Sequence, residues 1–186
     1  MTDSRDSSKI KRFRKSARDF FVPTTRQIGQ IEAVREVLAY ELSVSLKVDF
    51  VIETIDKLIA VYGCTLDNET IVHSDHGCHY TSHAFINKLK DAEFVQSMSR
   101  KGNCWDNAPQ ESFYGHMKDE ISDLVAGCSV YEEVKVIVDD WMDYYNHDRY
   151  QMDLKKLSPT EYYHYLLTGH YPLPSVALSS GSVKQP

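Results

Sequence analysis

The chain has 186 residues, of which 42% are apolar and 11% are aromatic, and it carries a net charge of −6. This composition is typical of a folded protein, and the length allows one good core without a second full domain. No stretch approaches the roughly 18 consecutive apolar residues of a membrane helix, and no apolar run behind the first residues indicates a signal peptide. The four cysteines are widely spaced, which suits a reducing compartment. We therefore expect a cytoplasmic protein without membrane contacts.

The charge is unevenly distributed along the chain. Residues 1–30 contain eight basic and three acidic residues, a balance of +5, so the remainder carries −11. Within this region, residues 1–18 are polar and basic and predict a disordered arm. A basic arm ahead of an acidic core is compatible with DNA contact, and a solvated basic tail explains it equally well. Residues 171–186 are rich in Pro, Ser and Gly and predict a flexible tail.

The first predicted elements are a strand and a helix. Residues 19–36 are ambiguous, because Pro23 confines the apolar run before it to the edge or the end of a sheet. Residues 37–43 predict a strand, with alternate side chains on opposite faces. Apolar residues then recur at helical spacing over 48–62, and Gly63 ends this helix.

Two further strands enclose a helix in the middle of the chain. A short apolar run predicts a buried strand over 70–73, and Thr81 or Ser82 caps a helix that reaches about residue 92. A third strand is predicted over 94–98.

The second half of the chain predicts mainly helices. Residues 99–107 are a loop by their Gly, Asn and Asp content. Two capping boxes then predict the starts of helices, namely Ser129-x-x-Glu132 and Ser158-x-x-Glu161. The first of these helices reaches about residue 147, and Gly169 ends the second. Strands that alternate with helices predict the α/β class.

Two carboxylates occupy distinctive contexts. Asp75 follows the predicted strand 70–73, and Glu111 comes two residues after Pro109, which suits the first turn of a helix. A residue at the carboxyl end of a strand in an α/β fold faces the crevice where ligands bind. Carboxylates on a strand end and on a nearby helix are the hard oxygen ligands that divalent cations need for phosphoryl transfer. Taken alone, each residue is also explained as a surface turn residue or as a first-turn acid favoured by the helix dipole.

Several short motifs follow one another between about residues 37 and 167. They are His73-Ser74-Asp75-His76-Gly77, Gly102 through Glu111, Phe113-Tyr114-Gly115-His116-Met117-Lys118, Tyr144-Tyr145-Asn146, Arg149-Tyr150-Gln151 and Leu157-Ser158-Pro159. With these motifs the chain resembles the catalytic core of bacterial insertion-sequence transposases. The resemblance is to the orfB type, whose cores look like retroviral integrase, and it covers most of the chain.

The resemblance implies an RNase H-like fold, with a mixed central sheet flanked by helices, over residues 19–170, of which 19–36 diverge. It also implies two Asp and one Glu that bind two Mg²⁺ or Mn²⁺ ions and catalyse DNA strand cleavage and strand transfer in transposition. Asp75 matches the second acid and Glu111 the third. The family's first acid stands in a Thr-Asp-apolar-Thr-Tyr segment, which is absent, so Asp19 is the candidate. We therefore expect a truncated or internally deleted copy.

Three residues are candidates for contacts with DNA. Lys118 matches a position where the family has a basic residue, so it is expected to reach a phosphate near the metal ions; an ordinary exposed lysine is the alternative. Asn107 could contact DNA, although an Asx residue before a helix is more often a cap. Trp105 could stack on a base or cover the edge of the core.

The partners implied are transposon-end and target DNA, together with a second copy of the chain or partner transposase subunits. The location implied is the bacterial cytoplasm, in association with the nucleoid. The alternative function is a catalytically inactive transposase remnant that folds and binds DNA or partner subunits.

A zinc site is a weaker hypothesis. Five possible ligands fall within eleven residues, namely His73, His76, Cys78, His79 and His83. They would straddle a strand end, a turn and a helix start, with no second cluster to complete a tetrahedral site. Farther along, Tyr144 and Tyr145 are interpreted as packing residues, and a role facing DNA for them and for Arg149 is the alternative.

Overall fold

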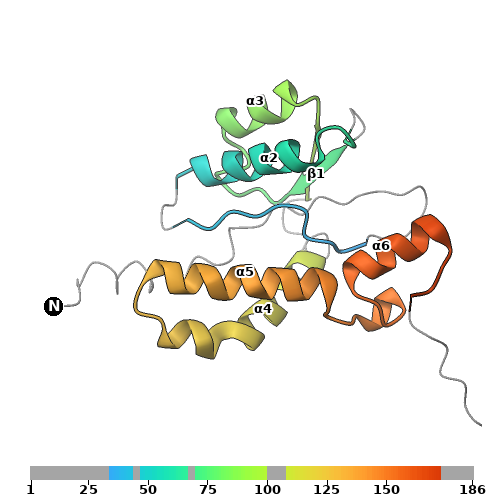
Figure 1. The fold of residues 1–186 in the computed structure, drawn as a ribbon. Helices are drawn as coiled ribbons and strands as arrows, with labels where there is room; N and C mark the ends of the chain where they lie inside the picture. Colours follow the sequence, from blue (N-terminus) through green and yellow to red (C-terminus); the bar gives the residue numbers. More distant parts are fainter. Residues whose placement is uncertain (1–33, 44–46, 67–69, 100–107, 173–186) are drawn as a thin grey trace, which may run out of the picture.

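The computed structural model describes residues 34–43, 47–66, 70–99 and 108–172, with the backbone alone for 108–110. Figure 1 shows the elements in chain order: α2 (Asp49–Tyr62), β1 (Ile71–Ser74), α3 (His83–Asp91), β2 (Val95–Met98), α4 (Ala108–Gly127), α5 (Tyr131–His147), the short 3₁₀ helix η2 (Met152–Leu154) and α6 (Pro159–Thr168). Within these ranges no helix is long and apolar enough to cross a membrane. The predicted basic arm, most of the divergent region and most of the predicted tail lie outside them.

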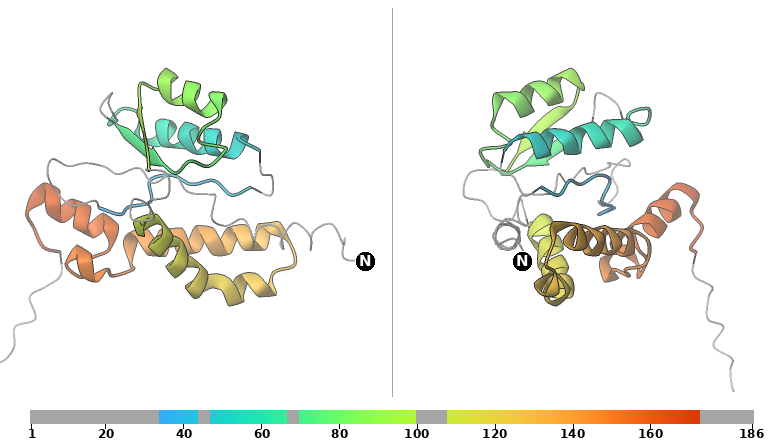
Figure 2. Two further views of the ribbon diagram at one scale, coloured as in Figure 1. Left: turned by 180° about the vertical axis from the view of Figure 1, so that it is seen from behind. Right: turned by 60° about the vertical axis from the view of Figure 1, so that its left-hand side comes forward.

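The elements form two layers. One layer contains α2, α3 and the β1–β2 sheet, and the other contains α4 and α5, with α6 beside the end of α5 (Figures 1 and 2). β1 and β2 pair in parallel, with Ile71 opposite Val95 and Ser74 opposite Met98. In the described part of the chain this parallel pair is the whole sheet, so the mixed sheet implied by the resemblance is not seen there.

The first layer follows from the apolar spacing of its helices. Val51, Ile55 and Leu58 lie four and three residues apart on α2, and each is at most 1% exposed. Phe85 and Leu89, four residues apart on α3, belong to the same buried cluster. Full burial of such side chains stabilises the fold by about 1.5–3 kcal/mol each, so this periodicity is sufficient to place both helices.

An aromatic cluster joins α4 to α5 in the second layer. The ring of Phe113 meets Trp141 and Tyr145 edge-on, with centroid separations of 5.4 and 4.8 Å. All three side chains are buried. Because edge-to-face pairs add about 0.5–1.5 kcal/mol beyond their buried area, this cluster fixes α4 firmly on α5.

The predicted helix ends are largely confirmed. Ser82 caps α3 by accepting a hydrogen bond from the Phe85 N–H, and Ser158 caps α6 in the predicted box. Gly169 ends α6 at a φ of 70°, in the left-handed region that favours glycine. The box predicted at Ser129-x-x-Glu132 is wrong by one residue. The helix begins at Tyr131, and the carboxylate that reaches back to the N–H groups of residues 129 and 130 belongs to Glu133.

The strand predicted over 37–43 is also wrong. The segment is extended, but only Tyr40 takes part in a β-bridge, and the segment runs between the two layers (Figures 1 and 2). Val37 and Leu38 are neighbours in sequence and are both buried, which a half-exposed strand does not allow. The segment is buried from both sides, so the backbone groups outside this bridge need partners of another kind.

Asn146 of α5 supplies one such partner. Its side-chain carbonyl accepts a hydrogen bond from the Val37 N–H at 2.9 Å, and its amide donates to the Val37 carbonyl at 2.8 Å. The amide of Asn146 therefore pairs with Val37 as a neighbouring strand would. Val37 is 5% exposed, so water could replace these bonds only after local opening.

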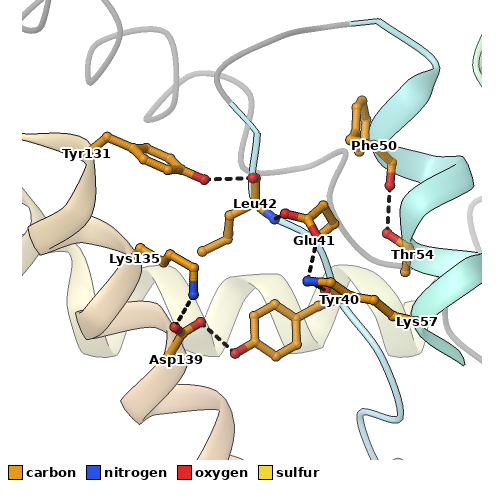
Figure 3. Close-up of polar contacts among 9 residues, drawn as sticks. All are labelled: Tyr40, Glu41, Leu42, Phe50, Thr54, Lys57, Tyr131, Lys135 and Asp139. Carbon is orange, nitrogen blue, oxygen red and sulfur yellow. Dashed lines mark hydrogen bonds and ion pairs between the residues drawn. The ribbon is translucent and has the colours of Figure 1, made fainter. Parts of the chain in front are cut away.

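Two further residues of α5 hold the segment farther along, as Figure 3 shows. The Tyr131 hydroxyl donates to the Leu42 carbonyl at 2.6 Å, and the Tyr40 hydroxyl donates to Asp139 at 2.7 Å, while Lys135 pairs with the same carboxylate. Burial raises the pKa of Tyr131 to about 12. The pKa of Tyr40 is raised still further, mainly by burial and then by the hydrogen bond to Asp139. Both hydroxyls therefore remain donors at any physiological pH.

The first layer contacts the same segment from the opposite side. Lys57 of α2 forms an ion pair with Glu41 and donates to the Tyr40 carbonyl at 3.4 Å (Figure 3). An ion pair with an exposed lysine contributes little stability. Its importance is geometric, because it attaches the segment to α2 as well as to α5.

Replacing Asn146 by Ala should test this arrangement. The Asn146→Ala variant leaves the buried N–H and carbonyl of Val37 without the amide, so we expect the free energy of unfolding to fall by about 1–3 kcal/mol. Urea unfolding followed by circular dichroism would measure the change. Asp140→Ala, at an exposed position of α5, is the control and should change it by no more than about 0.5 kcal/mol. Equal effects of the two variants would contradict the pairing of Asn146 with Val37.

Candidate active site

Asp75 lies at the carboxyl end of the parallel sheet, as predicted. β1 ends at Ser74, whose carbonyl accepts a hydrogen bond from the Ser99 N–H at 2.9 Å and so continues the pairing with β2. Val72 and Ser74 point into the core, and the carboxylate of Asp75 is exposed. This is the edge at which α/β sheets bind their ligands.

The turn after Asp75 is tightly hydrogen-bonded. One carboxylate oxygen of Asp75 accepts from the Gly77 N–H at 2.7 Å, and the Gly77 carbonyl accepts from the N–H groups of Tyr80 and Thr81. Gln96 of β2 reaches across and donates to the Tyr80 carbonyl at 2.8 Å. No pattern in the sequence indicates Gln96, because its role depends on which residue of β2 faces the turn. The turn is thus fixed both internally and to the neighbouring strand.

Glu111 lies in the first turn of α4 and is exposed. The buried side of this helix consists of Phe113, Tyr114, Met117, Ile121 and Val125. Lys118 is half-buried and comes seven residues after Glu111, which is close to two turns of 3.6 residues. Glu111 and Lys118 therefore share one side of α4, about 10 Å apart along its axis.

The two candidate carboxylates come from different layers. In the described ranges, no hydrogen bond or ion pair joins Asp75 to Glu111, and no group of three His, Cys, Asp or Glu side chains is arranged to hold a metal ion. Asp19, Trp105 and Asn107 lie outside those ranges. Two exposed carboxylates that form no ion pair with a described lysine or arginine fit the hard-ligand chemistry of Mg²⁺ or Mn²⁺.

The zinc hypothesis finds no support in the described residues. The imidazole of His73 meets the hydroxyl of Ser97 on β2 at 3.1 Å, whereas the ring of His79 packs edge-on against Phe50 of α2 at 5.2 Å. These two rings have different neighbours, and the histidines and Cys78 form no cluster of three ligands.

The interpretation of the C-terminal aromatic residues as packing residues is confirmed for Tyr145. It is 4% exposed, and burial raises the pKa of its hydroxyl. Tyr144 is exposed. Arg149 donates twice to one carboxylate oxygen of Glu120, at 3.0 and 2.8 Å, and the indole of Trp141 donates to the other at 2.8 Å. Arg149, which follows α5, is therefore bound to the second half of α4.

Comparison with known proteins shows what the chain is similar to. Residues 93–159 match a family model described as "Integrase core domain". The chain is 37% identical over 127 residues to the Escherichia coli protein "Putative transposase InsK for insertion sequence element IS150", covering 68% of this chain and 44% of that protein. It is 34% identical over 128 residues to a Haemophilus influenzae "Uncharacterized transposase-like protein", covering 68% and 57%. The chain is a relative of the insertion-sequence transposases with an integrase-like core.

This relationship extends to other insertion elements. A third relative, the "Transposase for insertion sequence element IS904" of Lactococcus lactis, is 37% identical over 95 residues, which are 51% of this chain and 38% of that protein. The chain thus spans about half the length of the curated relatives it matches. Glu111 and Lys118 of this transposase relative lie inside the matched integrase core, whereas Asp75 precedes it.

The pH dependence of stability should reveal the role of Glu120. Burial raises the pKa of Glu120, but hydrogen bonds from Arg149 and Trp141 outweigh it and hold the pKa below its ordinary value of 4.5. A lowered folded-state pKa stabilises the protein above 4.5, and this contribution is lost as the pH falls through the folded-state value. We therefore expect Glu120→Gln to be less stable than the unmodified chain at neutral pH, with a difference that shrinks in acid.

Urea unfolding over a pH series would measure this difference, with Asp140→Asn as a control on the exposed side of α5. A difference between Glu120→Gln and the unmodified chain that stays constant below pH 4.5 would contradict the ion pair with Arg149.

Proposed function

We propose that this chain is a DNA transposase core that cleaves DNA strands and joins them to a target with the help of divalent metal ions. The observation that carries the proposal is the exposed carboxylate of Asp75, held in a hydrogen-bonded turn at the carboxyl end of β1. The matched integrase core adds Glu111 at the start of α4.

In this proposal three carboxylates hold two Mg²⁺ or Mn²⁺ ions. Asp75 and Glu111 are two of them, and Asp19 remains the candidate for the third. When bound, the ions supply charge stabilisation and activate a water molecule or a DNA 3′-hydroxyl for in-line displacement at phosphorus. Asp75 presents its carboxylate from the sheet layer and Glu111 from the helical layer. Lys118, on the same side of α4 as Glu111, contacts a DNA phosphate.

The proposal extends to the fold and the partners. An RNase H-like fold is supported by the parallel β1–β2 pair, by α2 and α3 packed in the same layer, and by the family match, while its mixed sheet stays a prediction. The substrates are transposon-end and target DNA, and a second copy of the chain or a partner transposase subunit completes the assembly. Trp105 and Asn107 remain candidates for DNA contacts.

A catalytically inactive remnant is the second candidate. It is favoured by the sequence around Asp19, Arg-Asp-Phe-Phe-Val-Pro, which lacks the Thr-Asp-apolar-Thr-Tyr pattern of the family's first acid. Such a protein would fold and bind DNA or partner subunits without cutting DNA.

Substitution of the two carboxylates should separate these candidates. For an active enzyme we expect Asp75→Asn and Glu111→Gln each to abolish Mn²⁺-dependent nicking of supercoiled plasmid and to weaken Mn²⁺ binding measured by calorimetry. Asp123→Asn, at an exposed carboxylate on the same helix as Glu111, is the control and should behave as the unmodified chain. A folded unmodified chain that binds Mn²⁺ and does not nick DNA would identify the remnant. Unchanged Mn²⁺ affinity in both variants would disprove the metal site.

Lys118 should contribute to DNA binding and not to metal binding. Loss of one phosphate contact reduces the dependence of log affinity on log salt by about one unit, so we expect a shallower salt slope for Lys118→Gln. Fluorescence anisotropy with labelled duplex DNA at several salt concentrations would measure it. Lys90→Gln, at an exposed lysine of α3, is the control and should keep the salt slope of the unmodified chain. An identical slope in Lys118→Gln and the unmodified chain would show that Lys118 touches no phosphate.

A further inference from the structure

Gly77 lies where the turn after β1 comes closest to the Asp75 carboxylate. A Cβ atom at this position would stand 2.8 Å from Oδ1 of Asp75 and 3.3 Å from Cδ2 of Tyr80. Carbon atoms in favourable contact are about 3.5–4.0 Å apart, so an alanine there would force one neighbour to move. Among the described glycines only Gly169 has a positive φ, so Gly77 is needed for space and not for its backbone conformation.

The two neighbours differ in their freedom to move. The Tyr80 side chain is 8% exposed, its ring packs edge-on against Phe85 at 5.4 Å, and its carbonyl is held by Gln96. The Asp75 carboxylate is exposed, and its hydrogen bond in the described part of the chain is the one from the Gly77 N–H. A side chain at position 77 would therefore displace the carboxylate and leave the ring in place.

We propose that Gly77 is a positioning residue for the metal site: its N–H holds one oxygen of Asp75, and its lack of a side chain leaves the carboxylate in that place. The other oxygen is then available to a divalent cation such as Mn²⁺ or Mg²⁺, without the entropy loss of ordering a mobile side chain. This inference rests on the proposed function of Asp75 as a metal ligand. Gly77 itself does not touch the cation.

Substitution of Gly77 by Ala provides the first test. Loss of a group that orients a metal ligand commonly lowers metal affinity 10–100-fold, so we expect Gly77→Ala to bind Mn²⁺ at least about tenfold more weakly. Calorimetric titration of Mn²⁺ into the full chain would measure the affinity, and circular dichroism would follow thermal unfolding. Gly127→Ala is the matched control, since a Cβ at Gly127 meets no atom within 4 Å. Equal Mn²⁺ affinities for Gly77→Ala and Gly127→Ala would overturn the proposal.

The Asp75→Asn variant separates this inference from the proposed function. If Asp75→Asn binds Mn²⁺ as the unmodified chain does, the metal site itself is wrong, and with it the role of Gly77. If Asp75→Asn loses affinity while Gly77→Ala retains it, only the positioning role is wrong.

A stability measurement covers the case in which Gly77→Ala folds poorly. In the Asp75→Ala background the carboxylate is absent and only the contact with Tyr80 remains, so adding Gly77→Ala should lower the melting temperature less than it does in the unmodified chain. A Gly77→Ala chain that unfolds alone but folds in this background would support the contact with Asp75. If Gly77→Ala prevents folding in both backgrounds, the substitution acts on the turn itself and the proposal fails.

Discussion

The structure depends on how the backbone of the extended segment 34–43 is hydrogen-bonded. This segment lies between the two layers, where a buried N–H or carbonyl without a partner is costly. Side chains of α5 supply partners along the segment: Asn146 and Tyr131 pair with the backbone of Val37 and Leu42, and Asp139 accepts from the Tyr40 side chain. The residue numbers fall along α5 as they rise along the segment, so the two run antiparallel. Since Lys57 holds the segment from α2, the segment sets how the sheet layer meets the helical layer.

Local signals in the sequence were sufficient for most of the described helices. α2 follows from apolar spacing alone. Ser82, Ser158 and Gly169 mark the ends of α3 and α6, where the capping hydrogen bonds join residues only a few positions apart in sequence. The start of α5 was misplaced by one residue, because Glu132 and Glu133 both suit a capping box and only the backbone geometry selects Glu133. The strand predicted over 37–43 failed for a different reason. Its partner Asn146 is 109 residues away from Val37, and no local pattern carries that information.

In the candidate site, too, some features could be predicted from the sequence and others could not. The position of Asp75 at a strand end and of Glu111 in a first helical turn could be predicted, since each depends on a short run of neighbouring residues. The contact that ties the turn after Asp75 to β2 could not be predicted, because Gln96 reaches the Tyr80 carbonyl only through the parallel register of β1 and β2. Arg149 was considered a residue that could face DNA, whereas its guanidinium is bound by Glu120, 29 residues earlier. An ion pair between side chains 29 residues apart in sequence is invisible to motif reasoning.

The proposed metal site would connect the two layers in its own right. Asp75 belongs to the sheet layer and Glu111 to the helical layer, so an ion bound by both carboxylates would bind only when the layers are docked. A ligand that binds only the docked state stabilises that state. The free energy gained grows with the logarithm of the ratio of the ligand concentration to the dissociation constant. The same ions would offset part of the net charge of −6, which otherwise opposes the approach of a DNA phosphate. The segment 34–43 and the metal ions would then have the same structural effect. Both would hold the sheet layer against the helical layer, in the arrangement that brings Asp75 and Glu111 together for the reaction with DNA.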